Sequence, residues 1–421
     1  MLDLNYILEH KAEMVENAKN RGLKVSFDLI SELAGKRREL IMEIDDSRRR
    51  QKEISENIPK SENRGELIKE AKELKEEIDR LEKDLEKVAP KLKTELLKVP
   101  NITHPDSPIG KSEADNKVVE EIGKKPNFKF KPKGFDELMN NLDLIDFERG
   151  AKVVGQKFYY LKGDGALLEF ALINYALEML VKEGFTPYIT PDLAKDSIIE
   201  GAGFVPRGPE AQIYYIDGMG LGLIATAEIN LVGLHSDEVL EEKELPKKIA
   251  GFSHCFRREA GTYGQESKGI YRVHQFSKVE MFIYSKPEES DQMHQLVLEL
   301  EKKIFTGLKI PFRVLDCCTV ELALPAYRKY DLEAWLPAQN KWGEITSTTN
   351  ATDFQARRVS TKYKKADGKT EFVHMVNGTA IAVSRALVAI MENYQKEDGS
   401  VEIPKVLQKW LPKKVISPVE S

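Results

Sequence analysis

Charged side chains recur in parts of this sequence that otherwise favour buried strands. In residues 256–282, Arg257, Arg258 and Glu259 precede a loop that contains Gly261 and Gly264, and Arg272 and Glu280 follow it. Isolated charges buried in a sheet are costly unless they are paired or bind a charged ligand. We therefore expect a strand pair whose charges face a ligand. A solvated hairpin with cross-strand ion pairs is the alternative.

A second charge lies in an apolar run near the C-terminus. Arg385 is flanked by Ile381, Ala382 and Val383 on one side and by Leu387 on the other, in a predicted helix. Its guanidinium must reach a ligand or a carboxylate, and a structural ion pair is the simpler interpretation. The functional interpretation is that Arg257 and Arg385 flank a polyphosphate, where planar donors neutralise charge.

Carboxylates and one aromatic ring complete the candidate site. Glu228 and Glu280 are suited to hold an ammonium group, whereas Glu259 and Glu344 are suited to hold a nucleobase amine, a ribose or Mg²⁺ bridging phosphates. Phe276 offers a stacking face for a base. Together these residues indicate a site for a small amino acid beside ATP, without a covalent nucleophile.

The first 100 residues must form elements of a different kind. Apolar residues step by threes and fours through two segments, from Ile30 to Ile58 and from Leu67 to Leu92, and the breaker cluster 59–65 separates them. This pattern predicts two long helices paired antiparallel as a coiled-coil arm. Arg48, Arg49, Arg50 and Lys52 on this arm are suited to phosphate contact, and a dimerisation or spacer coiled coil remains the alternative.

Proline residues mark the end of the arm. Pro90 is expected to interrupt the second helix, and Pro100, Pro105 and Pro108 predict a linker over 101–135. Beyond it, strand-like runs alternate with amphipathic helices, which predicts an α+β domain over 136–421. The sequence contains neither GxGxxG nor GxxxxGK[ST], so we expect neither a Rossmann site nor a P-loop.

Bulk composition limits the remaining choices. The chain has 421 residues, a net charge of −5 and only three cysteines, Cys255, Cys317 and Cys318. This charge neither requires nor excludes a nucleic-acid partner, and the cysteines show no zinc-ligand spacing. Because neither a signal peptide nor a membrane span is recognisable, we expect a cytoplasmic protein without a membrane partner.

Six segments together resemble the seryl-tRNA synthetases of the common bacterial and eukaryotic type. They are TAE at 226–228, CFRREAG at 255–261, YRVHQFSKVE at 271–280, YDLEAWLP at 330–337, EITSTTNATDFQARR at 344–358, and NG at 377–378 followed by AVSR and NYQ. The resemblance covers essentially the full chain. It implies a class II aminoacyl-tRNA synthetase that activates L-serine with ATP, releases pyrophosphate and transfers serine to tRNA(Ser), with tRNA(Sec) left open.

The resemblance also implies an architecture. A helical-hairpin arm over 1–100 would bind the long variable arm of the tRNA, and the catalytic domain would contain an antiparallel sheet of six or seven strands flanked by helices. The proline-bearing segment 184–191 would form the interface of a homodimer.

Roles for individual residues follow from the same resemblance. The implied catalytic residues are Arg257, Glu344 and Arg385, and Glu344 also approaches Mg²⁺ carried by ATP. The implied serine contacts are Thr226, Ala227, Glu228, Arg257, Glu280, Asn377 and Thr379. The implied ATP contacts are Arg257, Arg258, Glu259, Arg272, Val273, Phe276, Glu344, Ile345, Thr346, Ser347 and Arg385.

Two segments depart from the family pattern. The family's CTGDLGF(A/S)AAK corresponds here to residues 318–328, which lack the Gly-Asp pair and contain Pro325. In NGTAIAVSR, Ala380 and Ser384 replace glycines and add side-chain volume near the expected substrate. These changes leave a second hypothesis open, a synthetase-like tRNA-binding or regulatory protein with impaired aminoacylation. Retention of the charged set favours an active enzyme.

Overall fold

The computed structural model describes residues 1–204, 212–259 and 269–419, so the loop glycines Gly261 and Gly264 lie outside the described residues. The chain divides into two compact units, Met1–Pro100 and Asn101–Ser421. Among the helices of the described ranges, none combines the length and apolar character that crossing a membrane would require.

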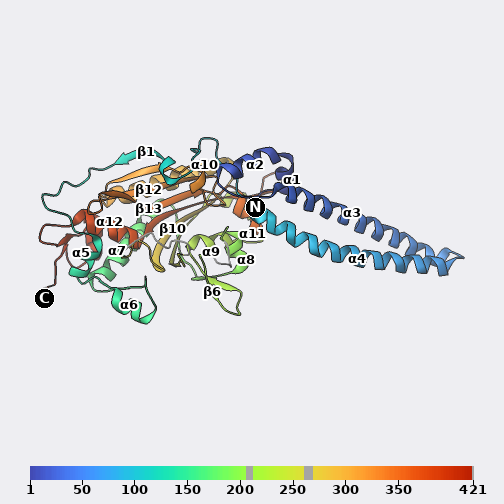
Figure 1. Cartoon of the computed structure of the whole chain (residues 1–421), viewed down its shortest axis with the longest axis horizontal. Helices are drawn as coiled ribbons and strands as arrows, with labels where there is room; N and C mark the ends of the chain where they lie inside the picture. The colour runs from blue at the N-terminus through green and yellow to red at the C-terminus, as the bar shows by residue number, and fades with distance from the viewer. Residues whose placement is uncertain (205–211, 260–268, 420–421) are drawn as a thin grey trace. The chain divides into compact units, whose positions relative to one another are not determined.

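The first unit contains the predicted helical hairpin. Figure 1 shows α3 (Phe27–Asn57) and α4 (Arg64–Leu97) side by side, joined by a short 3-10 turn. The expected seam is confirmed, since Ile30, Leu33, Leu40, Ile44 and Ile54 of α3 and Leu74, Ile78, Leu81, Val88 and Leu92 of α4 are buried. Two shorter helices, α1 (Leu4–Glu9) and α2 (Lys11–Asn20), precede the hairpin.

Pro90 does not interrupt the second helix, contrary to expectation, because α4 continues through it to Leu97. Proline in a helix interior costs about 3 kcal/mol. Pro90 itself is exposed, while Val88 and Leu92 on either side are buried in the seam. Burial of the seam outweighs the local penalty of one proline.

An eight-stranded sheet forms the centre of the second unit. Its order is β1 (Lys117–Ile122), β11 (Phe312–Asp316), β12 (Arg328–Leu336), β13 (Lys341–Asn350), β16 (His374–Ala382), β10 (Gln275–Ser285), β9 (Lys247–Phe256) and β4 (Thr186–Ile189). The sheet is thus larger than the expected six or seven strands, and its last pair, β4 with β9, is parallel. The segment 101–135, expected to be a linker, contributes edge strand β1, which pairs with β11.

Short strands and helices surround this sheet. The strands are β2 (Ile145–Asp146) with β3 (Tyr160–Leu161), β5 (Leu193–Lys195) with β6 (Tyr214–Ile216) and β7 (Leu221–Leu223), β8 (Val239–Glu241) with β14 (Lys362–Lys364) and β15 (Thr370–Phe372), and β17 (Val401–Glu402) with β18 (Val415–Ile416). The short helices are α5 (Phe135–Asn141), α6 (Phe147–Val153), α8 (Asp196–Gly201), α9 (Ala227–Gly233) and α11 (Phe354–Val359).

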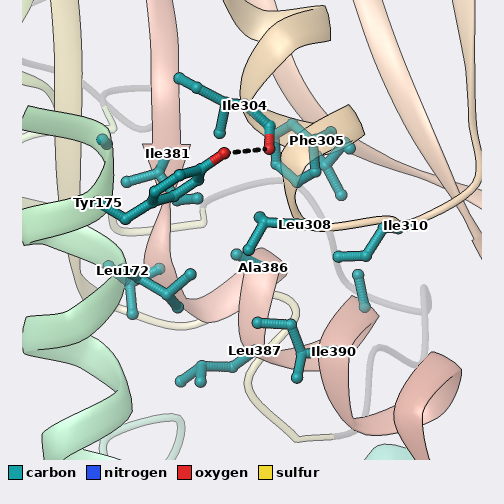
Figure 2. Close-up of a cluster of buried hydrophobic side chains, with 14 of the residues drawn as sticks. Leu172, Tyr175, Ile304, Phe305, Leu308, Ile310, Ile381, Ala386, Leu387 and Ile390 are labelled. Carbon is teal, nitrogen blue, oxygen red and sulfur yellow. Dashed lines mark hydrogen bonds between the residues drawn. The ribbon is translucent and has the colours of Figure 1, made fainter. Parts of the chain in front are cut away.

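Three longer helices build the main apolar core. In Figure 2, side chains of α7 (Asp164–Lys182), α10 (Ser290–Gly307) and α12 (Val383–Tyr394) converge with Ile381 of β16. The Tyr175 hydroxyl in this cluster is satisfied, since its Oη donates to the carbonyl of Ile304 at 3.0 Å. This packing fixes α12, the helix that carries Arg385 in its first turn.

Candidate active site

A cavity of about 400 Å³ lies in the second unit and gathers most of the predicted residues. Its predicted lining residues are Thr226, Glu228, Arg257, Glu259, Arg272, Val273, Phe276, Glu280, Glu344, Ile345, Thr346, Ser347, Asn377, Thr379 and Arg385. They come from the start of α9, from β10, from the residues just beyond the ends of β9 and β10, and from β13, β16 and α12. Residues more than 150 positions apart in the sequence thus share one cavity.

Two predicted residues do not line this cavity. Ala227 is fully buried in a hydrophobic cluster beneath α9, so its side chain is part of the core. Arg258 is exposed, and its backbone amide donates to the carbonyl of Gln212 at 2.9 Å. Arg257 and Glu259, on either side of Arg258, do line the cavity.

The predicted strand pair is confirmed, but most of its charges lie at the ends of the strands. β9 and β10 pair antiparallel, with Phe256 opposite Gln275. Arg257, Glu259 and Arg272 lie just beyond these ends, in the part of the hairpin next to the loop. Of the charges predicted to face a ligand in this pair, only Glu280 lies within a strand.

Each of these three charged side chains contacts a neighbouring group. Arg257 Nε donates to the carbonyl of Ala225 at 3.3 Å, and its guanidinium lies 5.3 Å from the Phe276 ring centre. Arg272 Nη1 lies 3.8 Å from Glu259 Oε2. A cation, an aromatic face and an ion pair are therefore available together to a nucleotide.

Glu228 is held by neutral donors. Thr226 caps α9 by accepting the backbone N–H of Glu228 at 3.2 Å. Oε1 of Glu228 accepts from Gln355 Nε2 at 2.7 Å and from Asn377 Nδ2 at 3.2 Å. Burial, reinforced by the nearby Glu280, raises the pKa of Glu228 to about 7.

Glu280 has a different environment. Lys278 Nζ lies 2.5 Å from Glu280 Oε2, and Thr379 Oγ1 donates to the same oxygen at 3.3 Å. Glu280 and Thr379 are opposite one another in the β10–β16 ladder. One of the two neighbouring carboxylates is therefore neutralised by lysine, and the other is not.

The far end of the cavity contains the pair Arg385 and Glu344. Arg385 Nη1 lies 2.7 Å from Glu344 Oε1, and the guanidinium lies 5.2 Å from the ring centre of Tyr271. The Tyr271 hydroxyl donates to the backbone carbonyl of Glu344 at 2.9 Å. Although burial opposes ionisation, Arg385 and then Lys329 lower the pKa of Glu344 to about 2, so this carboxylate is charged at neutral pH.

The residues that depart from the family pattern differ in whether they line the cavity. Ala380 is completely buried in the main core and does not line the cavity, contrary to the expectation that it adds volume beside the substrate. Ser384 does line the cavity. In the 318–328 segment, the carbonyl of Pro325 accepts from Asn101 Nδ2 at 2.8 Å, and only Ala323 reaches the cavity.

Sequence reasoning missed several lining residues, among them Phe204, Tyr271, Lys278, Ala323, Lys329, Thr349 and Ala382. The two lysines carried a recognisable signal. Lys278 lies two residues from Glu280, and Lys329 lies two residues from Asp331, whose Oδ2 is 2.8 Å from its Nζ. Residues i and i+2 of a strand share a face, so each lysine accompanies its carboxylate. Phe204 and Ala323 lie outside strands and gave no periodic signal.

The candidate metal ligand is a single carboxylate. Among residues 1–204, 212–259 and 269–419, no group of three or more His, Cys, Asp or Glu side chains is arranged to hold a metal ion. Glu344 nevertheless lines the cavity beside Thr346 and Ser347. A single carboxylate fits a Mg²⁺ ion that obtains most of its ligands from nucleotide phosphates and water.

The predicted basic cluster lies on α3 in the first unit. Arg48 pairs with Glu82 at 2.6 Å, Arg49 with Asp46 at 2.8 Å and Arg50 with Glu70 at 2.5 Å. All four side chains of the cluster, including Lys52, are exposed. Exposed pairs of this kind contribute little to stability.

Comparison with known proteins places both units in one family. Residues 1–103 match the seryl-tRNA synthetase N-terminal domain, and residues 216–394 match the tRNA synthetase class II core domain (G, H, P, S and T). The chain is 48% identical to the serine–tRNA ligase of Rubrobacter xylanophilus over 421 residues, covering 99% of each chain. It is 51% identical to that of Dictyoglomus turgidum over 416 residues, covering 98% of each.

A solved structure supports the same relationship. Seryl-tRNA synthetase from Pyrococcus horikoshii, crystallised with ATP, superposes with a TM-score of 0.93 at 40% identity and with complete coverage of both chains. Family models, full-length identity and fold agree with the helical arm, the antiparallel sheet and the charged cavity described above. The chain therefore belongs to the seryl-tRNA synthetases, class II enzymes that bind ATP and ligate serine to tRNA(Ser).

Proposed function

We propose that serine is activated in the 400 Å³ cavity, with its ammonium on Glu228 and its hydroxyl on Thr379 and Glu280. The unequal pairing of the two carboxylates carries this assignment. Glu280 has Lys278 at 2.5 Å, whereas Glu228 has no ion pair with a lysine or arginine among the described residues. A buried carboxylate without a cation gains most from the substrate ammonium.

ATP occupies the opposite part of the cavity in this proposal. The adenine stacks on Phe276 beside Val273, with Glu259 and Arg272 near it, and the α-phosphate lies by Arg257. The β- and γ-phosphates extend towards Arg385. The proposal is supported by the guanidinium of Arg257, which lies 5.3 Å from the Phe276 ring centre and so sits close to both adenine and phosphate.

The chemistry then needs orientation and charge stabilisation. A serine carboxylate oxygen attacks the α-phosphorus in line, pyrophosphate leaves towards Arg385, and Arg257 stabilises charge on the phosphoryl oxygens. Glu344, with Thr346 and Ser347, would hold the Mg²⁺ that accompanies ATP and neutralises its phosphates.

Transfer to tRNA requires the first unit in this proposal. Seryl-adenylate passes its acyl group to a hydroxyl of the terminal adenosine of tRNA(Ser), and AMP leaves. Meanwhile α3 and α4 bind the tRNA through the cluster Arg48, Arg49, Arg50 and Lys52. The exposed positions of these side chains support the assignment. We place this reaction in the cytoplasm, where aminoacylated tRNA is consumed.

A homodimer is proposed through the edge of the sheet. Within the expected segment 184–191, β4 exposes Tyr188 and Ile189, and the latter is 85% exposed. On α7, Leu167, Phe170 and Val181 are also exposed. An apolar edge strand beside exposed aromatic and aliphatic side chains favours burial against a second copy.

Substitution of Arg257 tests the assignment. Arg257→Ala should lower serine-dependent ATP–pyrophosphate exchange by about 10²-fold or more while the protein remains a folded dimer by sedimentation. Arg258→Ala is the matched control, because Arg258 is adjacent in sequence but its side chain does not line the cavity. This variant should retain exchange within about threefold of the wild-type rate. Wild-type exchange in Arg257→Ala would show that the phosphates are misplaced.

A further inference from the structure

The geometry around Glu228 points to a residue that none of the predicted roles includes. Gln355, in the short helix α11, has no exposed surface and does not line the cavity. Its side chain nevertheless contacts the carboxylate that we assign to the serine ammonium. The inference therefore rests on that proposed role of Glu228.

The Gln355 amide is fixed in one orientation by two acceptors. Nε2 donates to the carbonyl of Ala202 at 2.9 Å and to Glu228 Oε1 at 2.7 Å. Exchanging the amide nitrogen and oxygen would bring oxygen against both acceptors, so only this orientation is favourable. The Oε1 atom of Gln355 is buried and has no hydrogen-bond partner in the described part of the chain. The two hydrogen bonds donated by Nε2 therefore come with one buried acceptor left unsatisfied.

The two carboxylate oxygens of Glu228 are consequently different. Oε1 accepts from both Gln355 and Asn377. Oε2 makes no hydrogen bond within the described residues, while the side chain of Glu228 lines the cavity. The two amide donors thus turn one oxygen towards the protein and leave the other for a substrate.

We propose that Gln355 is a positioning residue for serine, which holds Oε1 of Glu228 so that Oε2 receives the substrate ammonium. Gln355 also favours the ionised form of Glu228, because a hydrogen bond to a carboxylate stabilises its charge. The other groups that face Glu228 are Glu280 and Lys278 from β10, Arg257 beyond β9 and Asn377 from β16. Of these, Glu280 opposes ionisation of Glu228 and the two cations favour it.

Gln355→Met tests the proposal, since it retains chain length and removes the donor. The KM for serine in ATP–pyrophosphate exchange should rise about tenfold or more, as expected for a lost hydrogen bond to a charged group, while the KM for ATP stays within about twofold. The acid limb of kcat/KM for serine should move to higher pH by about one unit. A purely structural role would not move this limb.

The chain offers a matched control outside the cavity. Gln339 Nε2 donates to Oε1 of the buried Glu392 at 2.9 Å, an amide–carboxylate pair of the same type. Gln339→Met should leave both the serine KM and the acid limb unchanged. Gln355→Glu provides a second variant that keeps the side-chain size and places a second carboxyl beside Glu228, so its acid limb should also move to higher pH.

The outcomes separate this inference from the proposed function. If the acid limb disappears in Glu228→Gln but keeps its wild-type position in Gln355→Met and Gln355→Glu, the role of Gln355 is refuted and that of Glu228 stands. If Glu228→Gln has the same serine KM and the same acid limb of kcat/KM as the wild type, the assignment of the ammonium to Glu228 fails. The inference about Gln355 then fails with it.

Discussion

Arg385 Nη1 lies 2.7 Å from Glu344 Oε1, an ion pair that joins the first turn of α12 to β13 across one end of the cavity. Each group stabilises the charged form of the other, which raises the pKa of Arg385 and lowers that of Glu344 to about 2. In the proposed mechanism, this pair supplies a fixed cation for the leaving pyrophosphate and a fixed anion for the Mg²⁺ that accompanies ATP.

Loss of this cation should affect chemistry more than folding. Arg385→Ala is expected to reduce ATP–pyrophosphate exchange by about 10²–10³-fold, because the leaving phosphates lose a preorganised donor. Arg313→Ala is the matched control, since Arg313 Nε pairs with Glu333 Oε2 at 2.5 Å and neither residue lines the cavity. Equal loss of exchange in both variants would assign the Arg385 effect to folding.

Serine binding should weaken in acid. A carboxyl with a raised pKa is neutral below that pKa, and the pKa of Glu228 is about 7. The KM for serine should therefore rise by up to about tenfold per pH unit below pH 7, as Glu228 loses its charge. Steady-state kinetics between pH 5.5 and 8 would measure this limb, and a flat serine KM across that range would contradict the role of Glu228.

Neutralising the basic cluster of the arm should weaken tRNA binding without affecting activation. A variant with glutamine at positions 48, 49, 50 and 52 should lose affinity for tRNA(Ser), and the slope of log affinity against log salt should fall by about one for each phosphate contact removed. Serine-dependent exchange without tRNA should remain at the wild-type level. An unchanged salt slope would remove these residues from the tRNA interface.

The buried side chain of Asn101 links the 318–328 segment to Ala351, just after β13. Asn101 Nδ2 donates to the carbonyls of Pro325 and Ala351 at 2.8 and 2.9 Å and lies 3.0 Å from Thr352 Oγ1. Asn101→Ala should lower the free energy of unfolding by about 1–3 kcal/mol, because buried acceptors lose their donor. Thermal unfolding would measure this loss. Asn5→Ala, in the exposed helix α1, is the control and should unfold like the wild type.

The sequence predicted the elements with the strongest periodicity. The arm follows from a seam that repeats every three to four residues, and the β9–β10 pair follows from two strand-like runs on either side of a glycine loop. The expected helix break at Pro90 was wrong because the low helix propensity of proline is outweighed by burial of Val88 and Leu92 against α3. The eighth strand and its parallel pairing depend on long-range contacts that no local pattern reports.

The site was predictable in its charges and less so in its partners. The motif resemblance predicted that Glu228, Arg257 and Arg385 share one site, and all three line the same cavity. It did not predict the ion pair between Lys278 and Glu280. Gln355 lies within the family segment 344–358 but carries no charge, so its residue type alone does not indicate a role in the site. Its contact with Glu228 joins residues 127 positions apart, which only the fold brings together.

Serine-dependent ATP–pyrophosphate exchange tests the central claim most directly. With millimolar serine and Mg²⁺-ATP, the protein should catalyse exchange without tRNA, and it should prefer serine over alanine by about 10⁴-fold because alanine leaves Glu280 and Thr379 without the substrate hydroxyl. Absence of exchange with serine, or equal exchange with alanine, would contradict the assignment of the cavity to serine activation.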